Sequence, residues 1–382
     1  MKRIVIVGGN IAAVTAATTL RARGWDGELT LIAAERHPPY SRVPLSKGVL
    51  AGAQAATDAH LPLVEGIDLT LGMAATGLDL EARRVHLDDG EAAAFDGLII
   101  ATGARARRLA VGCQSGELVV RTLEDSLQLA ERVRSATSAV VVGAGFLGME
   151  IASTLCRQGV AVTVVDLDPP LERLLGSWLG RHVAARAAEL GVRFVRTDGG
   201  VQLLGDPVAA VGLPDGRLLE GDLVVSAVGD VPNVDWLLPT GLACGDGVIV
   251  DAWCQVAPGI AAAGDVVAMR RADGSVVRTP HWSNAVAQGR AAALNLLEPR
   301  SARFEPDHYF WTEQFGIDLK IAGRLPLAGS PVVLHGDPAN GSALLQWAID
   351  DRPGAAVALN HRIPVARLKA IAAQPAHCTK EE

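Results

Sequence analysis

A run of glycines in the middle of the chain has the spacing of a dinucleotide-binding turn. It follows the apolar residues 139–142 and consists of Gly143, Gly145 and Gly148, with Phe146 and Leu147 before the last glycine. Such a turn lets backbone N–H groups approach a pyrophosphate at the N-terminus of a helix, where the helix dipole favours negative charge. The chemistry predicted here is therefore the binding of a dinucleotide.

An aspartate beyond this turn indicates which dinucleotide is bound. Asp166 lies at the end of the next expected strand, where a carboxylate accepts hydrogen bonds from the ribose hydroxyls. Asp168 adds a second carboxylate, and no cation lies between Asp166 and Arg173. Because a 2′-phosphate would be repelled there, the site is predicted to prefer NADH over NADPH.

The N-terminus holds a second, less regular turn of the same kind. Apolar residues 4–7 precede six residues: Gly8, Gly9, Asn10, Ile11, Ala12 and Ala13. Alanine is an accepted variant at the last position, whereas Asn10 replaces the middle glycine. Asparagine tolerates unusual backbone angles and can donate a hydrogen bond, so we also predict a nucleotide here, with Glu35 as the ribose partner. Two such sites imply a relay between two dinucleotides.

The surrounding sequence supplies the strands and helices that these turns require. After the first turn a helical stretch runs to about residue 23, with Gly24 as a stop signal, and a strand follows over 29–33. The second strand–helix–strand unit spans about 138–166, and helical runs are expected over 284–297 and 365–373. We therefore predict an α/β fold with two Rossmann-like dinucleotide-binding domains and a C-terminal α+β domain.

Composition excludes several other classes of protein. Of the 382 residues, 49% are hydrophobic and 20% charged, which is typical of a globular protein with more than one domain. The formal net charge of −7 argues against a nucleic-acid binder. No uncharged apolar run is long enough to span a bilayer, and the N-terminus lacks a signal-peptide pattern. We expect a cytoplasmic protein that binds neither nucleic acid nor membrane.

The cysteines exclude the thiol chemistry that accompanies many two-nucleotide flavoproteins. The chain has five, Cys113, Cys156, Cys244, Cys254 and Cys378, and none forms a Cys-x-x-Cys pair. The spacings of a zinc site, an iron–sulfur ligand set and a redox disulfide are all missing. We therefore expect no metal site and interpret these cysteines as structural thiols.

Five segments together resemble one family. In chain order they are YSRVPLSK at 40–47, ATG at 101–103, AGD at 263–265, HWSNA at 281–285 and FWTEQ at 310–314. Their sequence is similar to that of the FAD-dependent NAD(P)H:ferredoxin reductases of the putidaredoxin-reductase and dioxygenase-reductase kind. The resemblance covers essentially the whole chain, and the segment at 310–314 is its most specific part.

The resemblance implies which residues bind the two cofactors, FAD and NADH. The first turn would bind the FAD pyrophosphate, Glu35 the adenosine ribose, and Asp265 the ribityl or pyrophosphate portion. The other residues implied for FAD are Arg42, Lys47, Ala75, Ala101, Thr102, Gly103, Gly264, Trp282 and Trp311. Arg42 and Lys47 would approach the flavin, Ala75 would lie beside the adenine, and the two tryptophans would flank the isoalloxazine. The second turn, Glu150, Asp166 and Gly229 would bind NADH.

The resemblance also implies the reaction. Lys47 would pair with Glu150 near flavin N5, where a cation stabilises the electron-rich reduced ring. Trp311 is the third residue expected to take part. NADH would reduce FAD, and FAD would pass single electrons to a small iron–sulfur ferredoxin that serves an oxygenase such as a cytochrome P450.

Pro280 departs from the family, which usually has a glutamate just before the His281-Trp282 pair. This leaves open an NADH-dependent flavin oxidase or reductase that acts on oxygen or a small organic acceptor. A redox-sensing protein that binds both nucleotides without catalysis is the other alternative.

The domains predicted are an FAD domain over 1–108 and 240–303, an NADH domain over 109–239, and a C-terminal domain over 304–382. The oligomeric state does not follow from the sequence.

Overall fold

Each of the two units into which the chain divides is built on a largely parallel sheet, and in each sheet one central apolar strand leads into a glycine turn. The first unit comprises Met1–Ser41, Ala56–Arg105 and Asp230–Asp307, and the second comprises Arg42–Ala55, Ala106–Gly229 and His308–Glu382. The computed structural model describes residues 1–270, 274–349 and 352–374. The boundaries predicted for the FAD, NADH and C-terminal domains stay a prediction.

The sheet of the first unit is parallel except at one edge. Its order is β20-β21-β7-β1-β2-β3, and only β20 runs antiparallel to its neighbour. The strands are β1 (Arg3–Val7), β2 (Glu28–Ala33), β3 (Ile67–Leu71), β7 (Gly97–Ile100), β20 (Gln255–Ala257) and β21 (Ile260–Ala262). Ile4 and Ile6 have no exposed surface, as expected for a parallel strand that is covered on both faces.

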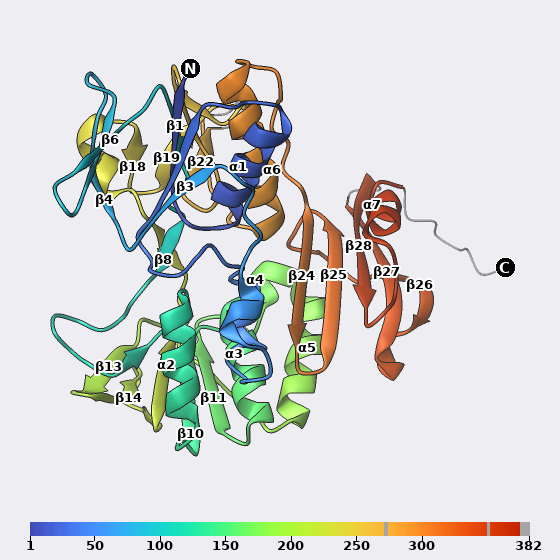
Figure 1. Cartoon of the computed structure of the whole chain (residues 1–382). Helices are drawn as coiled ribbons and strands as arrows, with labels where there is room; N and C mark the ends of the chain where they lie inside the picture. Colours follow the sequence, from blue (N-terminus) through green and yellow to red (C-terminus); the bar gives the residue numbers. More distant parts are fainter. Residues whose placement is uncertain (271–273, 350–351, 375–382) are drawn as a thin grey trace. The chain divides into compact units, whose positions relative to one another are not determined.

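Two helices cover one face of this sheet, α1 (Ile11–Ala22) and α6 (Trp282–Leu297). They lie side by side (Figure 1), and a Cβ added to Gly289 of α6 would lie only 2.5 Å from the carbonyl oxygen of Ala12 in α1. This close approach requires a glycine, and it holds the start of α1 against α6.

Smaller strands cover the opposite face. They form a three-stranded sheet of β4 (Ala75–Asp79), β5 (Arg84–Leu87) and β6 (Ala92–Ala94) and a four-stranded sheet of β18 (Ala243–Cys244), β19 (Gly247–Val250), β22 (Val267–Arg270) and β23 (Val276–Val277). The 3₁₀ helices η2 (Ala56–Ala59) and η3 (Asp235–Thr240) also belong to this unit. The short pair β8 (Ala104–Ala106) and β17 (Asp230–Pro232) lies where the chain passes from one unit to the other.

The second unit begins with another parallel sheet, of order β12-β11-β10-β16-β9. Its strands are β9 (Glu117–Leu118), β10 (Ser138–Val142), β11 (Ala161–Asp166), β12 (Arg193–Arg196) and β16 (Leu223–Ser226). The antiparallel strands β13 (Gln202–Gly205), β14 (Val208–Gly212) and β15 (Leu218–Glu220) pack on one face. The helices are α2 (Leu123–Val133), α3 (Phe146–Arg157), α4 (Glu172–Leu175) and α5 (Ser177–Glu189), with the 3₁₀ helix η1 (Val43–Ser46).

The C-terminal part of the second unit is an antiparallel sheet with one helix. Its order is β24-β25-β28-β27-β26, with β24 (Tyr309–Gln314), β25 (Ile317–Gly323), β26 (Val332–Asp337), β27 (Ser342–Ile349) and β28 (Arg352–Leu359). The helix α7 (Val365–Ala372) packs on β28 and β25, and η4 (Pro338–Asn340) joins β26 to β27. The predicted fold class, two Rossmann-like domains and a C-terminal α+β domain, is confirmed.

Candidate dinucleotide sites and a buried ion pair

The first glycine turn leaves no room for side chains at its first two positions. Gly8 has φ +136°, and a Cβ there would lie 2.0 Å from the carbonyl oxygen of Ala101. A Cβ on Gly9 would lie 2.7 Å from the Cβ of Ala33. The backbone of the turn is thus bare where it leaves β1, which is the shape that a pyrophosphate requires.

The side chain of Asn10 is folded into this turn. Its amide oxygen accepts hydrogen bonds from the N–H groups of Ala12 (3.0 Å) and Ala13 (3.4 Å), which makes Asn10 the N-cap of α1. Its amide nitrogen donates to the carbonyl oxygen of Ala101 at 2.6 Å. Asn10, which replaces the usual glycine, therefore caps α1 and links the turn by a hydrogen bond to the residue that follows β7.

Parallel pairing brings the other predicted residues of the first unit to the same edge of the sheet. Val7 pairs with Ile32 and Ile100, and Ile100 pairs with Ala262, so the residues after these strands share one edge. They are Gly8, Glu35, Ala101, Thr102, Gly103, Gly264 and Asp265. Glu35 accepts a hydrogen bond from the Tyr40 hydroxyl. Ala75 opens β4, outside this sheet.

Two residues that the sequence did not suggest hold the Gly264-Asp265 segment. The Gln288 amide oxygen accepts a hydrogen bond from the N–H of Gly264 at 2.9 Å. Arg278 donates to the carbonyl oxygen of Asp265 at 2.7 Å and forms a two-point ion pair with Asp230, at 2.9 and 3.2 Å. Asp230 and Arg278 are 48 residues apart, so no local pattern could have joined them.

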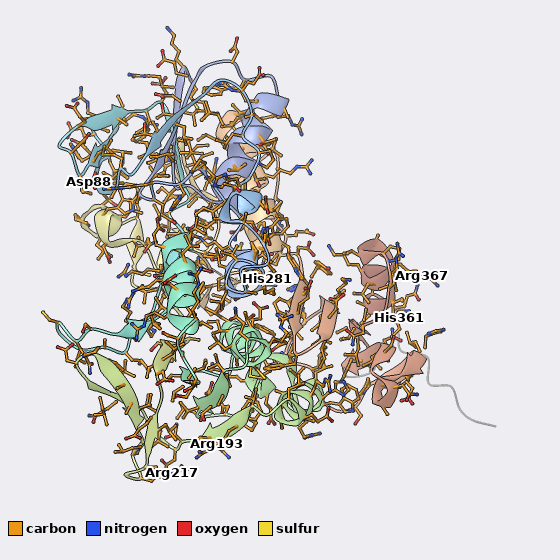
Figure 2. All side chains as sticks on the ribbon, turned by 60° about the horizontal axis from the view of Figure 1, so that its bottom comes forward. Asp88, Arg193, Arg217, His281, His361 and Arg367 are labelled. Carbon is orange, nitrogen blue, oxygen red and sulfur yellow. The ribbon has the colours of Figure 1, made fainter. Side chains whose placement is uncertain are left out.

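The start of α6 carries a histidine and an exposed tryptophan. Burial lowers the pKa of His281, labelled in Figure 2, while the carboxylates of Asp265 and Asp307 act in the opposite direction. Burial is the stronger effect, and it favours the neutral imidazole. The Trp282 residue is 40% exposed, which leaves part of it accessible for contact with another molecule.

The second turn is also shaped by close approaches of backbone. Gly143 has φ +108°, and a Cβ there would lie 2.4 Å from the carbonyl oxygen of Ala227. A Cβ on Gly148 would lie 1.9 Å from the carbonyl oxygen of Gly143. Gly145 has more room, since its Cβ would meet only the Leu174 side chain at 3.6 Å. Phe146 and Leu147 begin α3 directly after it.

Asp166 ends β11 with its carboxylate turned toward this turn. It accepts hydrogen bonds from the backbone N–H groups of Ala144 (2.5 Å), Leu167 (2.6 Å) and Asp168 (3.3 Å). Gly229, which is also predicted to bind NADH, has φ +97° and open space where a Cβ would be.

The structure adds a cation that the local sequence around Asp166 lacks. Arg196 is the register partner of Asp166 on β12, and its Nε donates to the carbonyl oxygen of Leu167 at 2.9 Å. Arg217 in turn donates to the carbonyl oxygen of Arg196 at 3.2 Å. Figure 2 labels Arg217 and also Arg193, which lies on β12 with Arg196.

An ion pair between a partly buried lysine and a buried glutamate lies in the second unit. The Lys47 Nζ is 2.5 Å from Oε2 of Glu150, which lies in the second turn of α3 and is only 9% exposed. The hydroxyl of Ser46 donates to the same oxygen at 2.6 Å, and the hydroxyl of Thr312 donates to Oε1 at 2.7 Å. Arg42, five residues before Lys47, donates to the carbonyl oxygen of Arg121 at 2.7 Å.

Aromatic side chains surround the beginning of β24. The ring of Trp311 stacks on that of Tyr309, with centroids 5.9 Å apart and planes at 24°. The ring of Phe310 lies 4.1 Å from that of Phe146 at the start of α3. The C-terminal sheet therefore packs directly against the helix that begins at the second glycine turn.

The cysteines in the described part of the chain are unpaired. Cys113 and Cys244 are exposed, Cys156 is half-buried and Cys254 is buried, and Cys378 lies outside the described residues. Burial raises the pKa of the Cys254 thiol to about 12, which keeps it protonated and unreactive at neutral pH.

Family models account for almost all of this architecture. A model described as pyridine nucleotide-disulphide oxidoreductase matches residues 2–289. The chain belongs to this family of oxidoreductases. A second model, described as reductase C-terminal, matches residues 309–382 of this oxidoreductase. The predictions of an enzyme and of FAD and NADH as its cofactors are confirmed at the level of the family and its relatives.

Individual relatives specify the branch of the family. The biphenyl dioxygenase system ferredoxin–NAD(+) reductase component of Paraburkholderia xenovorans (strain LB400) is 34% identical over 368 residues, which cover 94% of this chain and 90% of that protein. Rhodocoxin reductase of Rhodococcus erythropolis is 34% identical over 343 residues, 86% of this chain and 80% of that protein. The resemblance to these reductases, predicted from the five segments, is confirmed.

A solved structure agrees with this assignment. The crystal structure of the covalent putidaredoxin reductase–putidaredoxin complex matches with a TM-score of 0.87 and 29% identity, over 97% of this chain and 93% of that chain. In the part of our chain that the structure describes, no helix has both the length and the apolar character needed to cross a bilayer.

Proposed function

We propose that this oxidoreductase passes electrons from NADH through FAD to a small iron–sulfur ferredoxin, which serves an oxygenase such as a cytochrome P450. The observation that carries the proposal is the presence of two glycine turns of the same construction in one chain. In both, the first glycine meets the carbonyl oxygen that follows a neighbouring strand, Ala101 in one and Ala227 in the other. The name of the biphenyl dioxygenase relative, a ferredoxin–NAD(+) reductase component, supports the choice of a ferredoxin as acceptor.

The first turn suits FAD. Gly8 and Gly9 leave the backbone bare, and α1 has no acidic residue in its first turn to repel a pyrophosphate. Glu35 would hold the adenosine ribose, and Asp265, fixed through its backbone by Arg278, would hold the ribityl or pyrophosphate portion. Arg42, Ala75, the 101–103 segment, Trp282 and Trp311 remain the other residues proposed for this cofactor.

The second turn suits NADH. Its bare backbone at Gly143 and Gly148 would hold the pyrophosphate, and the Asp166 carboxylate would accept from the ribose hydroxyls. Gly229 would line the nicotinamide half of the coenzyme, where its open surroundings leave space.

Lys47 and Glu150 are the residues proposed to act on electron transfer. FAD, when bound, supplies the exchange between two-electron chemistry with NADH and one-electron chemistry with an iron–sulfur centre. The Lys47 ammonium, whose side chain is partly buried, would stabilise negative charge that develops near it, because water screens such a charge less than an exposed one. Glu150 fixes the position of that ammonium and would orient the nicotinamide. Trp311 would provide a flat apolar surface beside the isoalloxazine ring of FAD.

One observation favours a second candidate function. Pro280 stands where the reductases of the resembled family usually have a glutamate. If transfer of electrons to a ferredoxin requires that glutamate, this protein uses an acceptor other than a ferredoxin. The second candidate is an NADH-dependent flavin oxidase or reductase that acts on oxygen or a small organic acceptor. In either case we propose the cytoplasm as the place of the reaction.

Steady-state turnover with several acceptors tests the proposal. NADH oxidation is measured with a panel of small [2Fe–2S] ferredoxins, with oxygen alone, and with a quinone as an organic acceptor. We expect at least one ferredoxin to raise the rate about tenfold or more above that with oxygen. Equal rates with and without every ferredoxin, together with rapid turnover on oxygen or the quinone, would replace the proposal by the oxidase function.

A further inference from the structure

The Glu150 carboxylate is buried, yet both of its oxygens accept hydrogen bonds. Oε1 accepts from Thr312 at 2.7 Å, and Oε2 accepts from Ser46 at 2.6 Å and lies 2.5 Å from the Lys47 ammonium. A carboxylate taken out of water is strongly destabilised unless such donors replace the water. This residue is therefore held in one orientation by three named side chains.

These side chains come from three segments of the second unit that are far apart in sequence. Ser46 and Lys47 lie in and directly after η1, Glu150 lies in α3, and Thr312 lies in β24 of the C-terminal sheet. Thr312 has no exposed surface and is 162 residues from Glu150. The C-terminal sheet thus supplies the only protein donor to Oε1 among the contacts of the described residues.

A second residue fixes the direction of the Thr312 hydroxyl. The amide nitrogen of Gln314, itself 2% exposed, donates to the Thr312 oxygen at 3.2 Å. A hydroxyl has one proton, so an oxygen that accepts from Gln314 directs its own proton to Glu150. Gln314, Thr312 and Glu150 form a chain of two hydrogen bonds, in which the bond from Gln314 orients the hydroxyl that donates to Glu150.

Other buried hydroxyls in the same neighbourhood make a different kind of bond. Thr154 donates to the carbonyl oxygen of Ser46 and Ser126 to that of Leu45, each at 2.7 Å. Those bonds hold backbone segments together, which is a purely structural role. Thr312 instead donates to a carboxylate that is paired with the lysine proposed to act on electron transfer, and hydrogen bonds to charged groups are the stronger class.

We propose that Thr312, aligned by Gln314, is a positioning residue for the reduction of FAD by NADH. It fixes the Glu150 carboxylate so that the carboxylate holds the Lys47 ammonium in its working place. The reductase C-terminal domain would then take part in the reduction of FAD by NADH. This proposal rests on the proposed function, because it concerns the same ion pair.

The test compares Thr312→Val, which keeps the shape and removes the hydroxyl, with Thr312→Ser, which keeps the hydroxyl. Thr240→Val is a matched control, since the Thr240 hydroxyl donates to the backbone carbonyl of Leu237 in the first unit. The FAD-loaded proteins are mixed with saturating NADH without oxygen, and the decay of the flavin absorbance gives the reduction rate. FAD content and the thermal unfolding midpoint are measured on the same samples, with and without Glu150→Ala.

We expect Thr312→Val to slow reduction about tenfold or more at unchanged FAD content, and Thr312→Ser and Thr240→Val to stay within about twofold. We also expect Thr312→Val to lower the unfolding midpoint in the wild-type background and to have little further effect on midpoint or rate in Glu150→Ala. If Thr312→Val does not fold, Thr312→Ala makes the same comparison.

Two results would overturn the inference. One is an unchanged reduction rate in Thr312→Val, and the other is an equal effect of that change with and without Glu150, which would indicate a structural role alone. Both require that NADH reduces the wild-type flavin. If the wild-type flavin stays oxidised, the proposed function itself fails, so the two failures are distinguishable.

Discussion

At the scale of single residues, Asn10 shows how a departure from a family pattern is accommodated. A side chain at the middle position of the turn would crowd a pyrophosphate if it pointed outward. The structure instead places the carboxamide inside the turn, where it accepts from Ala12 and Ala13 and donates to Ala101. Asparagine is suited to this position because its neutral side chain both accepts hydrogen bonds from backbone N–H groups and donates one to a backbone carbonyl.

A charged replacement tests this explanation. Asn10→Asp keeps the acceptor but loses the donor to Ala101 and adds a negative charge where the FAD pyrophosphate is proposed to bind. We expect the dissociation constant for FAD to rise about tenfold or more, measured by fluorescence titration of the FAD-free protein. Asn10→Ser, which keeps a neutral cap, serves as the control. An aspartate variant that binds FAD as tightly as the wild type would refute the assignment of the first turn.

Arg196 changes how coenzyme preference is explained at the second site. The local sequence offers only carboxylates near Asp166, but parallel pairing of β11 with β12 brings the Arg196 guanidinium to the Leu167 carbonyl. We therefore propose that a preference for NADH depends on the Asp166 carboxylate more than on a lack of cations. Removal of that carboxylate leaves a cation available for a 2′-phosphate.

The corresponding prediction uses two variants. Asp166→Ser should raise the ratio of kcat/KM for NADPH to kcat/KM for NADH about tenfold or more, because repulsion is removed while Arg196 remains. Asp166→Ser combined with Arg196→Ala should lose most of this gain. A ratio that does not move in the single variant would mean that Asp166 is not the ribose partner.

At the scale of elements, the shape of both glycine turns depends on unusually close approaches between backbone segments. In the first unit, α1 and α6 meet where Gly289 faces the carbonyl oxygen of Ala12. In the second unit, the start of α3 folds back so that Gly148 faces Gly143. Each approach holds a helix N-terminus beside the end of a central strand, where we propose that a pyrophosphate binds.

The α1–α6 contact gives a stability prediction. Gly289→Ala should lower the free energy of unfolding by about 1–3 kcal/mol, because the added Cβ cannot fit without moving α1. The measurement is urea unfolding of the FAD-loaded protein. Gly245→Ala, at an exposed position with nothing near the added Cβ, should change it by less than about 0.5 kcal/mol. Equal effects at the two positions would show that the α1–α6 contact is not tight.

Elements with a strong local pattern were predictable from the sequence. The first helix ends one residue before the expected position, at Ala22, and Gly24 follows with φ +77°. The predicted helix over 284–297 is α6, which begins two residues earlier at Trp282. These elements are set by periodicity and by stop residues, which are properties of neighbours in the chain.

Contacts between distant segments were not predictable in the same way. The bonds that hold Glu150 join it to Ser46, 104 residues away, and to Thr312, 162 residues away. No pattern within one element gives such a pairing, although Thr312 stood inside the FWTEQ segment that carried the resemblance. Arg196 was missed for a related reason, since only the register of two parallel strands brings it to Asp166.

At the scale of the whole molecule, two turns of the same construction lie in a chain that ends in a reductase C-terminal domain. The family contains enzymes that reduce disulfides, but the described cysteines of this chain are unpaired and Cys254 is held protonated. The electrons are therefore proposed to leave through FAD to an external carrier. The central claim is that NADH bound at the second turn reduces FAD bound at the first.

Rapid mixing of the FAD-loaded protein with NADH in the absence of oxygen tests this claim most directly. We expect the oxidised flavin absorbance to be lost within seconds, and we expect Lys47→Ala to slow this loss about tenfold or more while it keeps its FAD. A wild-type flavin that stays oxidised in the presence of saturating NADH would contradict the account.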